Sequence, residues 1–293
     1  MFDVEKILVM TDSGADLTAE EAKKYSIEVI PFTYSFDGEN YYRDGVDKTT
    51  EEFYEIERAS KDVPKTAQIS PVQFEEIYGR AYNDGYTHLI LTLLSGTGSG
   101  TFQNASMMAE SFMEEHPDFH IELIDSQSYT VVYGYAVVEG AKAVLEGKTA
   151  AEAADRIRHV LEGSGVRFIV GDLNHLKRGG RINAATLVVA NMLDIKPVLT
   201  IKGGLVVQDG MIRGSKNLYK KFVADVEKHA DFENGTIVVI NTCIPDKAEE
   251  LKNTILEKYP GINVKVSLVG STIGCHCGPD LVAIVYFKDK FEV

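Results

Sequence analysis

The sequence predicts an α/β protein of two domains. We expect an N-terminal domain with a mostly parallel sheet flanked by helices, followed by a smaller, sandwich-like α/β domain. Short apolar runs alternate with longer amphipathic stretches, which is typical of βαβ units with right-handed crossovers. A chain of 293 residues commonly folds as two domains. The composition changes at the Glu-Gly-Ser-Gly stretch 162–165, so we place the domains at 1–162 and 163–293.

The expected N-terminal domain begins with two strands. The first covers 6–10, and the second covers 27–34, where Pro31 indicates a sheet edge because proline cannot donate to a ladder. Further strands are expected at 88–94 and 121–124. Helices are expected at 18–25, 49–59, 70–84, 102–113, 131–145 and 149–161, the first three with capping boxes at their starts.

The expected C-terminal domain continues the alternation. Residues 172–181 form a basic helical turn with a Gly pair, Gly179-Gly180, near its end, and Gly203-Gly204 joins 197–201 to 205–208 in a hairpin. The other strands are expected at 166–170, 236–241, 263–269 and 282–287. The other helices are expected at 183–193, 215–230 and 246–259.

The stretch 94–105 joins a buried strand to a helix through glycines and hydroxyl residues. The first N–H groups of a helix lack internal partners and the helix dipole favours negative charge there, so this loop predicts an anion site. A P-loop would need Lys after Gly100, and the dinucleotide pattern would need glycine in place of Thr101. A nucleophile elbow would need glycines two residues either side of Ser99. A site for a phosphorylated small molecule and a flexible loop that binds nothing therefore stay open as alternatives.

Polar residues follow three of the predicted parallel strands. They are Thr11-Asp12-Ser13, Ser95 with Ser99, and Asp125-Ser126. The carboxyl ends of parallel strands meet at one edge of a sheet, where ligands tend to bind. We therefore expect these residues to converge, although turn chemistry alone also favours Asp and Ser at strand ends.

The composition excludes several classes of protein. The formal charge of −14 disfavours binding to nucleic acid, because no basic excess is present to offset phosphates. The N-terminus resembles no signal peptide, and no run approaches the ~20 apolar residues of a membrane span. Three cysteines, an odd number, do not suggest a disulfide framework, so we expect a cytoplasmic protein.

The Cys275-His276-Cys277 triplet has an unusual spacing for a zinc site, since only Cys243 is left as a further cysteine. In an extended segment the two cysteines would point to one face and His276 to the other. We therefore expect no metal and no cofactor, and we interpret His276 as a hydrogen-bond donor or a proton-linked charge partner in a polar, glycine-rich loop.

Several short motifs occur in an order that resembles the DegV family of fatty-acid-binding proteins. The motifs are Thr11-Asp12-Ser13, Thr66-Ala67-Gln68-Ile69-Ser70, Ser99-Gly100-Thr101 before Gln103-Asn104-Ala105, Asp125-Ser126, Leu176 to Ile182, Lys196 to Leu199, and His276-Cys277-Gly278-Pro279. The resemblance spans almost the whole chain. It implies that the two domains hold one long-chain fatty acid, with its acyl chain in an apolar tunnel that the C-terminal domain closes.

The resemblance also assigns residues to the carboxylate of the fatty acid. Thr66 and Ser99 would hydrogen-bond it, and His276 with Arg181 would complete its surroundings. We favour Arg181 over Arg178 because Arg181 occupies the Gly-Gly-Arg-Ile position. The further residues expected at the ligand are Ser95, Gly100, Thr101, Asp125 and Ser126.

The resemblance implies a carrier without catalytic residues of its own. Some members of the family present the bound acid to a fatty acid kinase, which makes an acyl phosphate for phospholipid synthesis. This chain departs from the family pattern at Ile69, where Pro is usual, and at Gly98, where Leu is usual. The alternatives are an enzyme or binding protein for a phosphorylated small molecule, and a regulator that docks a partner through its basic turn.

Overall fold

The computed structural model describes residues 5–182 and 195–291, and the chain divides into two compact units. The first unit is Met1–Thr33 with Ala67–Glu162, and the second is Tyr34–Thr66 with Gly163–Val293. The division after Glu162 lies where the sequence predicted a boundary. Residues 34–66, which we expected in the first domain, instead group with the second. The helix expected at 183–193 lies outside the described residues.

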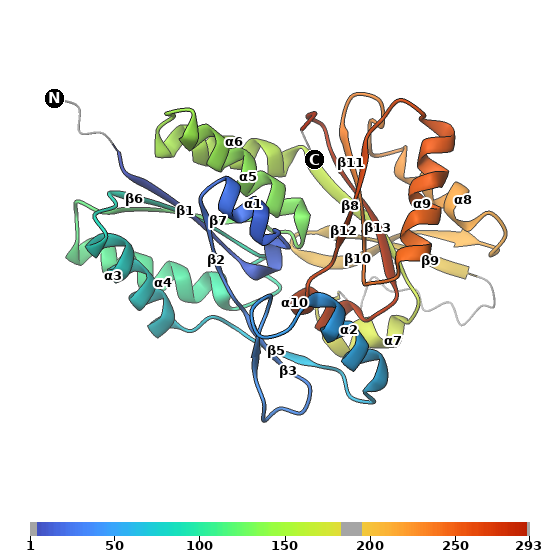
Figure 1. Ribbon diagram of the computed structural model, residues 1–293, viewed down its shortest axis with the longest axis horizontal. Helices are drawn as coiled ribbons and strands as arrows, with labels where there is room; N and C mark the ends of the chain where they lie inside the picture. Colours follow the sequence, from blue (N-terminus) through green and yellow to red (C-terminus); the bar gives the residue numbers. More distant parts are fainter. Residues whose placement is uncertain (1–4, 183–194, 292–293) are drawn as a thin grey trace. The chain divides into compact units, whose positions relative to one another are not determined.

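The first unit is built on a parallel sheet, as predicted. Its strands have the order β2 (Ile27–Ile30), β1 (Ile7–Asp12), β6 (His88–Leu93), β7 (His120–Asp125). One face is covered by α3 (Pro71–Asn83) and α4 (Thr101–Glu115), and the other by α5 (Val131–Leu145) and α6 (Ala150–Glu162) (Figure 1). A short helix, α1 (Ala19–Lys24), and a 3-10 turn, η1 (Ser13–Ala15), lie between β1 and β2 in the chain. Pro31 follows an edge strand, as expected.

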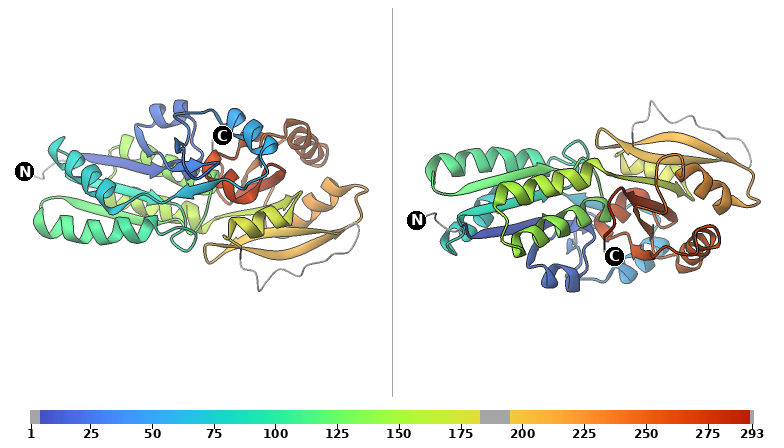
Figure 2. Two further views of the ribbon diagram at one scale, coloured as in Figure 1. Left: turned by 90° about the horizontal axis from the view of Figure 1, so that it is seen from below. Right: turned by 90° about the horizontal axis from the view of Figure 1, so that it is seen from above.

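The second unit contains a six-stranded mixed sheet, so it is the larger of the two rather than the smaller. The strands have the order β10 (Leu205–Arg213), β9 (Ile195–Lys202), β8 (Ser164–Val170), β13 (Leu281–Phe287), β11 (Thr236–Asn241), β12 (Val264–Leu268). All neighbours are antiparallel except β11 and β12. The β9–β10 hairpin at the sheet edge, drawn in orange in Figure 2, forms around Gly203-Gly204 as predicted.

Helices α8 (Leu218–Val226) and α9 (Pro245–Lys258) form the main core of this unit with the sheet. Phe222 and Leu251 are fully buried there, against strand residues such as Ile237 and Val239. The sheet therefore has a thick apolar layer on the side where these helices lie, and the predicted site residues come from other elements.

A second cluster of this unit explains why residues 34–66 belong to it. The segment forms β3 (Thr33–Ser35), β4 (Tyr42–Arg43), α2 (Thr50–Ala59) and β5 (Lys65–Ala67), the strands in the order β4-β3-β5. The Tyr54 hydroxyl donates to the carbonyl of Val269 (2.9 Å), and the Asp44 carboxylate accepts from the Thr272 hydroxyl (2.6 Å). These partners are far away in the sequence, so periodicity could not reveal them.

Two short helices complete this cluster. They are α7 (Leu173–Gly179), the predicted basic turn, and α10 (Ser271–Cys277), which packs against α7 and α2. The Cys275-His276-Cys277 triplet is therefore helical, and the extended geometry that we predicted for it is wrong. Successive side chains of a helix are about 100° apart, so the two cysteines do not share one face with His276 opposite.

Candidate functional site

The predicted polar residues form two groups, one in each unit. In the first unit the loops that follow β1, β6 and β7 come together, which confirms the predicted convergence. The buried carboxylate of Asp12 holds them: it accepts from the backbone N–H of Gly14 (2.9 Å) and Leu94 (2.8 Å) and from the Tyr133 hydroxyl (2.6 Å). Hydrogen bonds to a charged acceptor are worth about 1.5–3 kcal/mol each, so Asp12 braces the loops rather than awaiting a ligand.

The backbone N–H groups of the glycine-rich loop after β6 largely have partners in the loop itself and in Asp125 at the end of β7. The N–H of Gly96 donates to the Asp125 carboxylate (3.0 Å), and the N–H groups of Gly98 and Ser99 donate to the carbonyl of Ser95 (3.0 and 3.1 Å). A phosphate cradle needs such donors free, and a neighbouring carboxylate would repel a phosphate. This geometry disfavours the phosphorylated ligand that the sequence left open.

Ser99 is half-buried at the start of α4. Its Oγ lies 2.9 Å from the Thr101 Oγ1 and accepts from the Thr101 N–H (3.2 Å). Thr101 is fully buried and accepts from the N–H of Ile69 (3.2 Å). Thr101 therefore fixes the loop, and Ser99 is the more accessible of the two hydroxyls.

The other predicted residues of this group differ in exposure. Gly100 is exposed, whereas Ser95 and Ser126 are buried. The Ser126 hydroxyl donates to the carbonyl of Ser128 (3.2 Å) and accepts from its N–H (3.1 Å). Asp125 accepts a second bond from the N–H of Gln127 (2.9 Å). Ser95, Asp125 and Ser126 thus have clear structural partners in the loops, which turn chemistry explains.

The second group brings together Thr66, His276 and Arg181, all of the second unit. The Thr66 Oγ1 lies 2.9 Å from Nε2 of His276, and Nδ1 of His276 lies 2.9 Å from the carbonyl oxygen of Gly179. Arg181 donates to the same carbonyl (3.0 Å). Three elements, β5, α10 and the end of α7, therefore meet at one half-buried histidine.

The electrostatics of this group keep His276 neutral. Burial of the ring, together with the nearby positive charge of Arg181, lowers the pKa of His276 to about 4. Near pH 7 the ring therefore carries one proton, and the group as a whole keeps the positive charge of Arg181. It offers a hydroxyl, an imidazole and a guanidinium, which suit an anionic or hydroxyl-bearing head group.

A glycine allows this geometry. A side chain on Gly179 would bring its Cβ within 2.5 Å of the His276 carbonyl oxygen, so only glycine lets α7 approach the backbone of α10 this closely. Gly180 has a φ of +74° and ends α7 in the left-handed conformation that glycine favours. The two glycines of the predicted turn thus have different roles: Gly179 allows the close approach of α7 to α10, and Gly180 allows the left-handed backbone that ends α7.

The sequence did not reveal a buried Glu57–His175 pair behind this group. Oε1 of Glu57 lies 3.4 Å from Nε2 of His175, which also lies 3.3 Å from the carbonyl of Cys275. Burial raises the pKa of Glu57 to about 8 and lowers the pKa of His175. The signal for this pair was present: Glu57 lies one helical turn after buried Phe53, on the apolar face of its helix.

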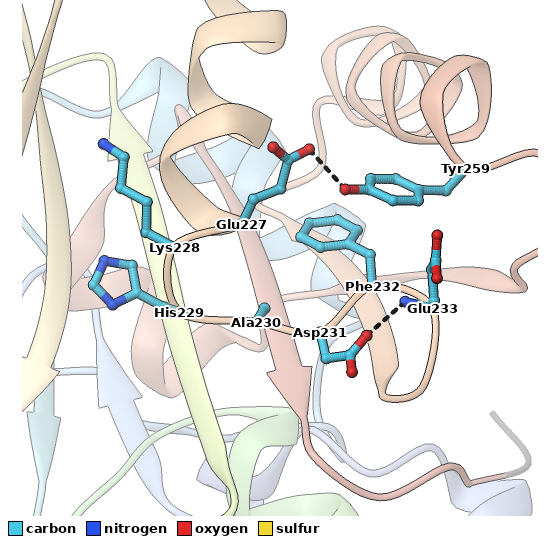
Figure 3. Close-up of a pocket in the computed structure, with 8 residues that line it drawn as sticks. All are labelled: Glu227, Lys228, His229, Ala230, Asp231, Phe232, Glu233 and Tyr259. Atoms are coloured by element: carbon cyan, nitrogen blue, oxygen red, sulfur yellow. Dashed lines mark hydrogen bonds between the residues drawn. The ribbon is translucent and has the colours of Figure 1, made fainter.

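Two of the hollows among the described residues of the second unit bear on the candidate site. One of about 410 Å³ is bordered by Glu57, His175 and the exposed Arg178, whereas the hydrogen bonds and the charge at His276 come from Thr66, Gly179 and Arg181. The other, of about 470 Å³, is shown in Figure 3. Its wall contains Glu227, which accepts from the Tyr259 hydroxyl (3.0 Å), and none of the predicted site residues.

In residues 5–182 and 195–291, no group of three or more His, Cys, Asp or Glu residues is arranged to hold a metal ion. Within the same ranges, every helix is too short or too polar to cross a membrane.

Comparisons with known proteins point to one family. A family model described as "Uncharacterised protein, DegV family" matches residues 6–289 of this chain. A DegV domain-containing protein of Clostridium perfringens is 31% identical over 97% of this chain and 99% of its own. A DegV domain-containing protein of Halalkalibacterium halodurans is 32% identical over 97% of this chain and 99% of its own.

Solved structures show the same fold. A DegV family protein of Thermus thermophilus described by its fatty acid binding has a TM-score of 0.85 at 26% identity, covering 96% of this chain and 99% of its own. A fatty acid binding DegV family protein of Streptococcus agalactiae has a TM-score of 0.86 at 26% identity, covering 98% and 100%. A stearic acid-binding protein of Eubacterium ventriosum has a TM-score of 0.80 at 25% identity, covering 97% and 98%. The two-unit α/β architecture predicted from the sequence is thus confirmed.

Proposed function

This chain belongs to the DegV family, and from that premise we propose that it binds one long-chain fatty acid, of the palmitate or oleate kind, in a buried apolar tunnel. The support comes from similar structures whose names state fatty acid binding, at 25% and 26% identity. Most of the affinity would come from the acyl chain, at about 0.8 kcal/mol for each buried CH₂ group. The head group would set the orientation.

The observation that carries the proposal is a series of hydrogen bonds: Thr66 is bonded to His276, and His276 is bonded to the carbonyl of Gly179, to which Arg181 also donates. A carboxylate at the end of an apolar tunnel is costly unless it is hydrogen-bonded or paired. Thr66 supplies a hydroxyl and Arg181 a positive charge, and each charge-assisted hydrogen bond is worth about 1.5–3 kcal/mol. The hydroxyl of Ser99 is a second expected donor, and its role is tested separately below.

We propose further that the chain is a carrier and not an enzyme, and that it presents the carboxyl group to a fatty acid kinase in the cytoplasm. The carboxylates of buried Asp12 and half-buried Asp125 accept hydrogen bonds from backbone N–H groups, which leaves them poorly suited to act as a general acid and base. A partner that supplies ATP would therefore carry out any chemistry on the acid.

Native mass spectrometry of the purified protein, with organic extraction of whatever is bound, tests the proposal directly. We expect one C14–C18 fatty acid for each chain. A protein that carries none, and that takes up neither added palmitate nor added oleate, would contradict the carrier function.

The head-group residues are tested by titration of Thr66→Ala, Ser99→Ala and the double variant. We expect the double variant to lose far more affinity for a fatty acid than for the alcohol of the same length, because the acid loses charge-assisted bonds and the alcohol only neutral ones. Thr254→Ala, at a partly exposed threonine of α9 remote from the predicted site residues in the sequence, is a matched control. Equal losses for acid and alcohol would show that these hydroxyls do not contact the carboxyl group.

A further inference from the structure

The hydrogen bonds around His276 fix where its proton lies. The carbonyl oxygen of Gly179 can only accept, so Nδ1 of His276 must donate to it across 2.9 Å. A neutral imidazole has a single N–H, and Nε2 is therefore an acceptor. The hydroxyl of Thr66, 2.9 Å from Nε2, consequently donates its one proton to the ring. With a neutral ring, Thr66 offers only lone pairs to any other group.

A carboxylate cannot form a hydrogen bond with the Thr66 hydroxyl while that hydroxyl donates to His276. Its oxygens are acceptors, and so is the Thr66 oxygen while its proton points to His276. If the hydroxyl turned toward the carboxylate, Nε2 would lose its donor in a half-buried place. A second proton on the ring removes the conflict, because Nε2–H then donates to Thr66 and Thr66 donates to the carboxylate.

We propose that a long-chain fatty acid binds to this chain together with one proton, which Nε2 of His276 takes up. The inference rests on the proposed function and describes how the same site distinguishes head groups. A fatty alcohol brings a hydroxyl proton that it can donate to Thr66, so it binds without proton uptake. A methyl ester brings neither a proton nor a charge, so it binds more weakly than both.

The groups that act on His276 favour such a coupled event. Among the described residues, α7 and its following turn bring His175 and Arg181 to bear on the ring, and α2 brings Glu57 and Arg58 to the neighbouring residues. Arg181 and His175 oppose a positive charge on the ring, and Glu57 lies against His175. Arg58 donates to the carbonyls of Thr242 and Cys243. The ring therefore stays neutral until a negative charge arrives, and a bound carboxylate supplies one.

Calorimetric titration with myristate, in two buffers of different ionisation enthalpy, counts the protons. For the natural protein at pH 7 we expect uptake of about one proton per acid, and a Kd that rises about tenfold for each pH unit from 6.5 to 8. Tetradecanol should bind with no uptake. The side-chain amide of His276→Gln can donate to Thr66 and takes up no proton in this pH range, so myristate should bind with no uptake and a Kd independent of pH. His229→Gln, at an exposed histidine of the same unit, should behave as the natural protein.

Several outcomes would overturn the inference. Myristate binding without proton uptake would do so, and so would undiminished uptake by His276→Gln. The tautomer is measured independently by ¹⁵N NMR of the ring: we expect Nδ1–H in the acid-free protein and protons on both nitrogens in the complex. An Nε2–H tautomer in the acid-free protein refutes the starting geometry even if His276→Gln fails to fold. If no acid binds while the Nδ1–H tautomer is present, the proposed function itself fails and this inference with it.

Discussion

Adjacent glycines at the end of α7 give a sharp test of the geometry around His276. In Gly179→Ala the new Cβ would lie 2.5 Å from the carbonyl oxygen and 2.8 Å from the Cα of His276. Both are backbone atoms, so the clash cannot be relieved by turning a side chain, and α7 must move away from α10. In Gly180→Ala the new Cβ would meet no atom within 4 Å, and only the φ of +74° is unfavourable.

The two substitutions should therefore differ in the free energy of unfolding. Forcing an extra methyl group into a packed contact costs about 1–3 kcal/mol, and loss of the Gly179–His276 hydrogen bond costs about 1 kcal/mol more. We expect Gly179→Ala to destabilise the protein by about 2–4 kcal/mol. A left-handed alanine costs about 1–2 kcal/mol, partly offset by the lower entropy of the unfolded chain, so Gly180→Ala should cost about 1 kcal/mol.

Urea unfolding followed by far-ultraviolet circular dichroism measures this difference, since the chain has no tryptophan to report by fluorescence. Hydrogen exchange locates it: amides of α10 should exchange faster in Gly179→Ala, whereas those of β1 and β6 in the first unit should not change. The His276 ring should also lose its preference for the Nδ1–H tautomer in this variant alone. Equal stability of the two variants, or a larger loss in Gly180→Ala, would refute the close contact between α7 and α10.

Two further variants test other parts of the structure. Because the pKa of Glu57 is raised to about 8 in the folded state, its contribution to stability is complete below pH 4.5 and is lost as the pH rises through 8. Glu57→Gln should therefore have the same free energy of unfolding in urea as the natural protein at pH 4, and a free energy about 2–5 kcal/mol higher at pH 8.5. An equal effect of the substitution at both pH values would show that this carboxyl group is not held neutral. In Asp12→Asn, one of the two side-chain oxygens that accept from backbone N–H groups is replaced by an NH₂ group. We expect the free energy of unfolding, measured by thermal unfolding, to fall by about 3 kcal/mol, and an unchanged Tm would contradict the role of Asp12 in holding the loops together.

The elements of the first unit were predictable because each leaves a local signal. Capping boxes at Thr18 and Ser70 mark helix starts that the structure confirms. Buried parallel strands such as β6 appear as continuous apolar runs, and their polar ends converge because all four strands of the sheet run in one direction. Apolar runs and helix capping depend on residues that are close together in the sequence, so they can be predicted from the sequence alone.

The division into units was harder to predict because it depends on contacts between distant residues. Segment 34–66 carries ordinary strand and helix signals, and nothing in them says which sheet it accompanies. The Tyr54–Val269 and Asp44–Thr272 hydrogen bonds decide this, and each joins residues more than 200 positions apart. The helical form of the Cys275-His276-Cys277 triplet was missed for a similar reason: α10 has seven residues, and its packing against α7 and α2 stabilises it more than its own propensity.

The candidate site shows the same limit in its chemistry. The resemblance to the DegV family selected Thr66, His276 and Arg181, and the structure brings these three together. The resemblance could not point to the carbonyl oxygen of Gly179, because every residue has a backbone carbonyl and a motif does not distinguish one from another. This oxygen nevertheless decides which nitrogen of His276 carries the proton. The direction of the Thr66 hydroxyl follows from that nitrogen, and with it the kind of head group that the site accepts. The ligand class can thus be predicted from side chains, whereas its protonation state depends on one main-chain oxygen that only glycine packing places there.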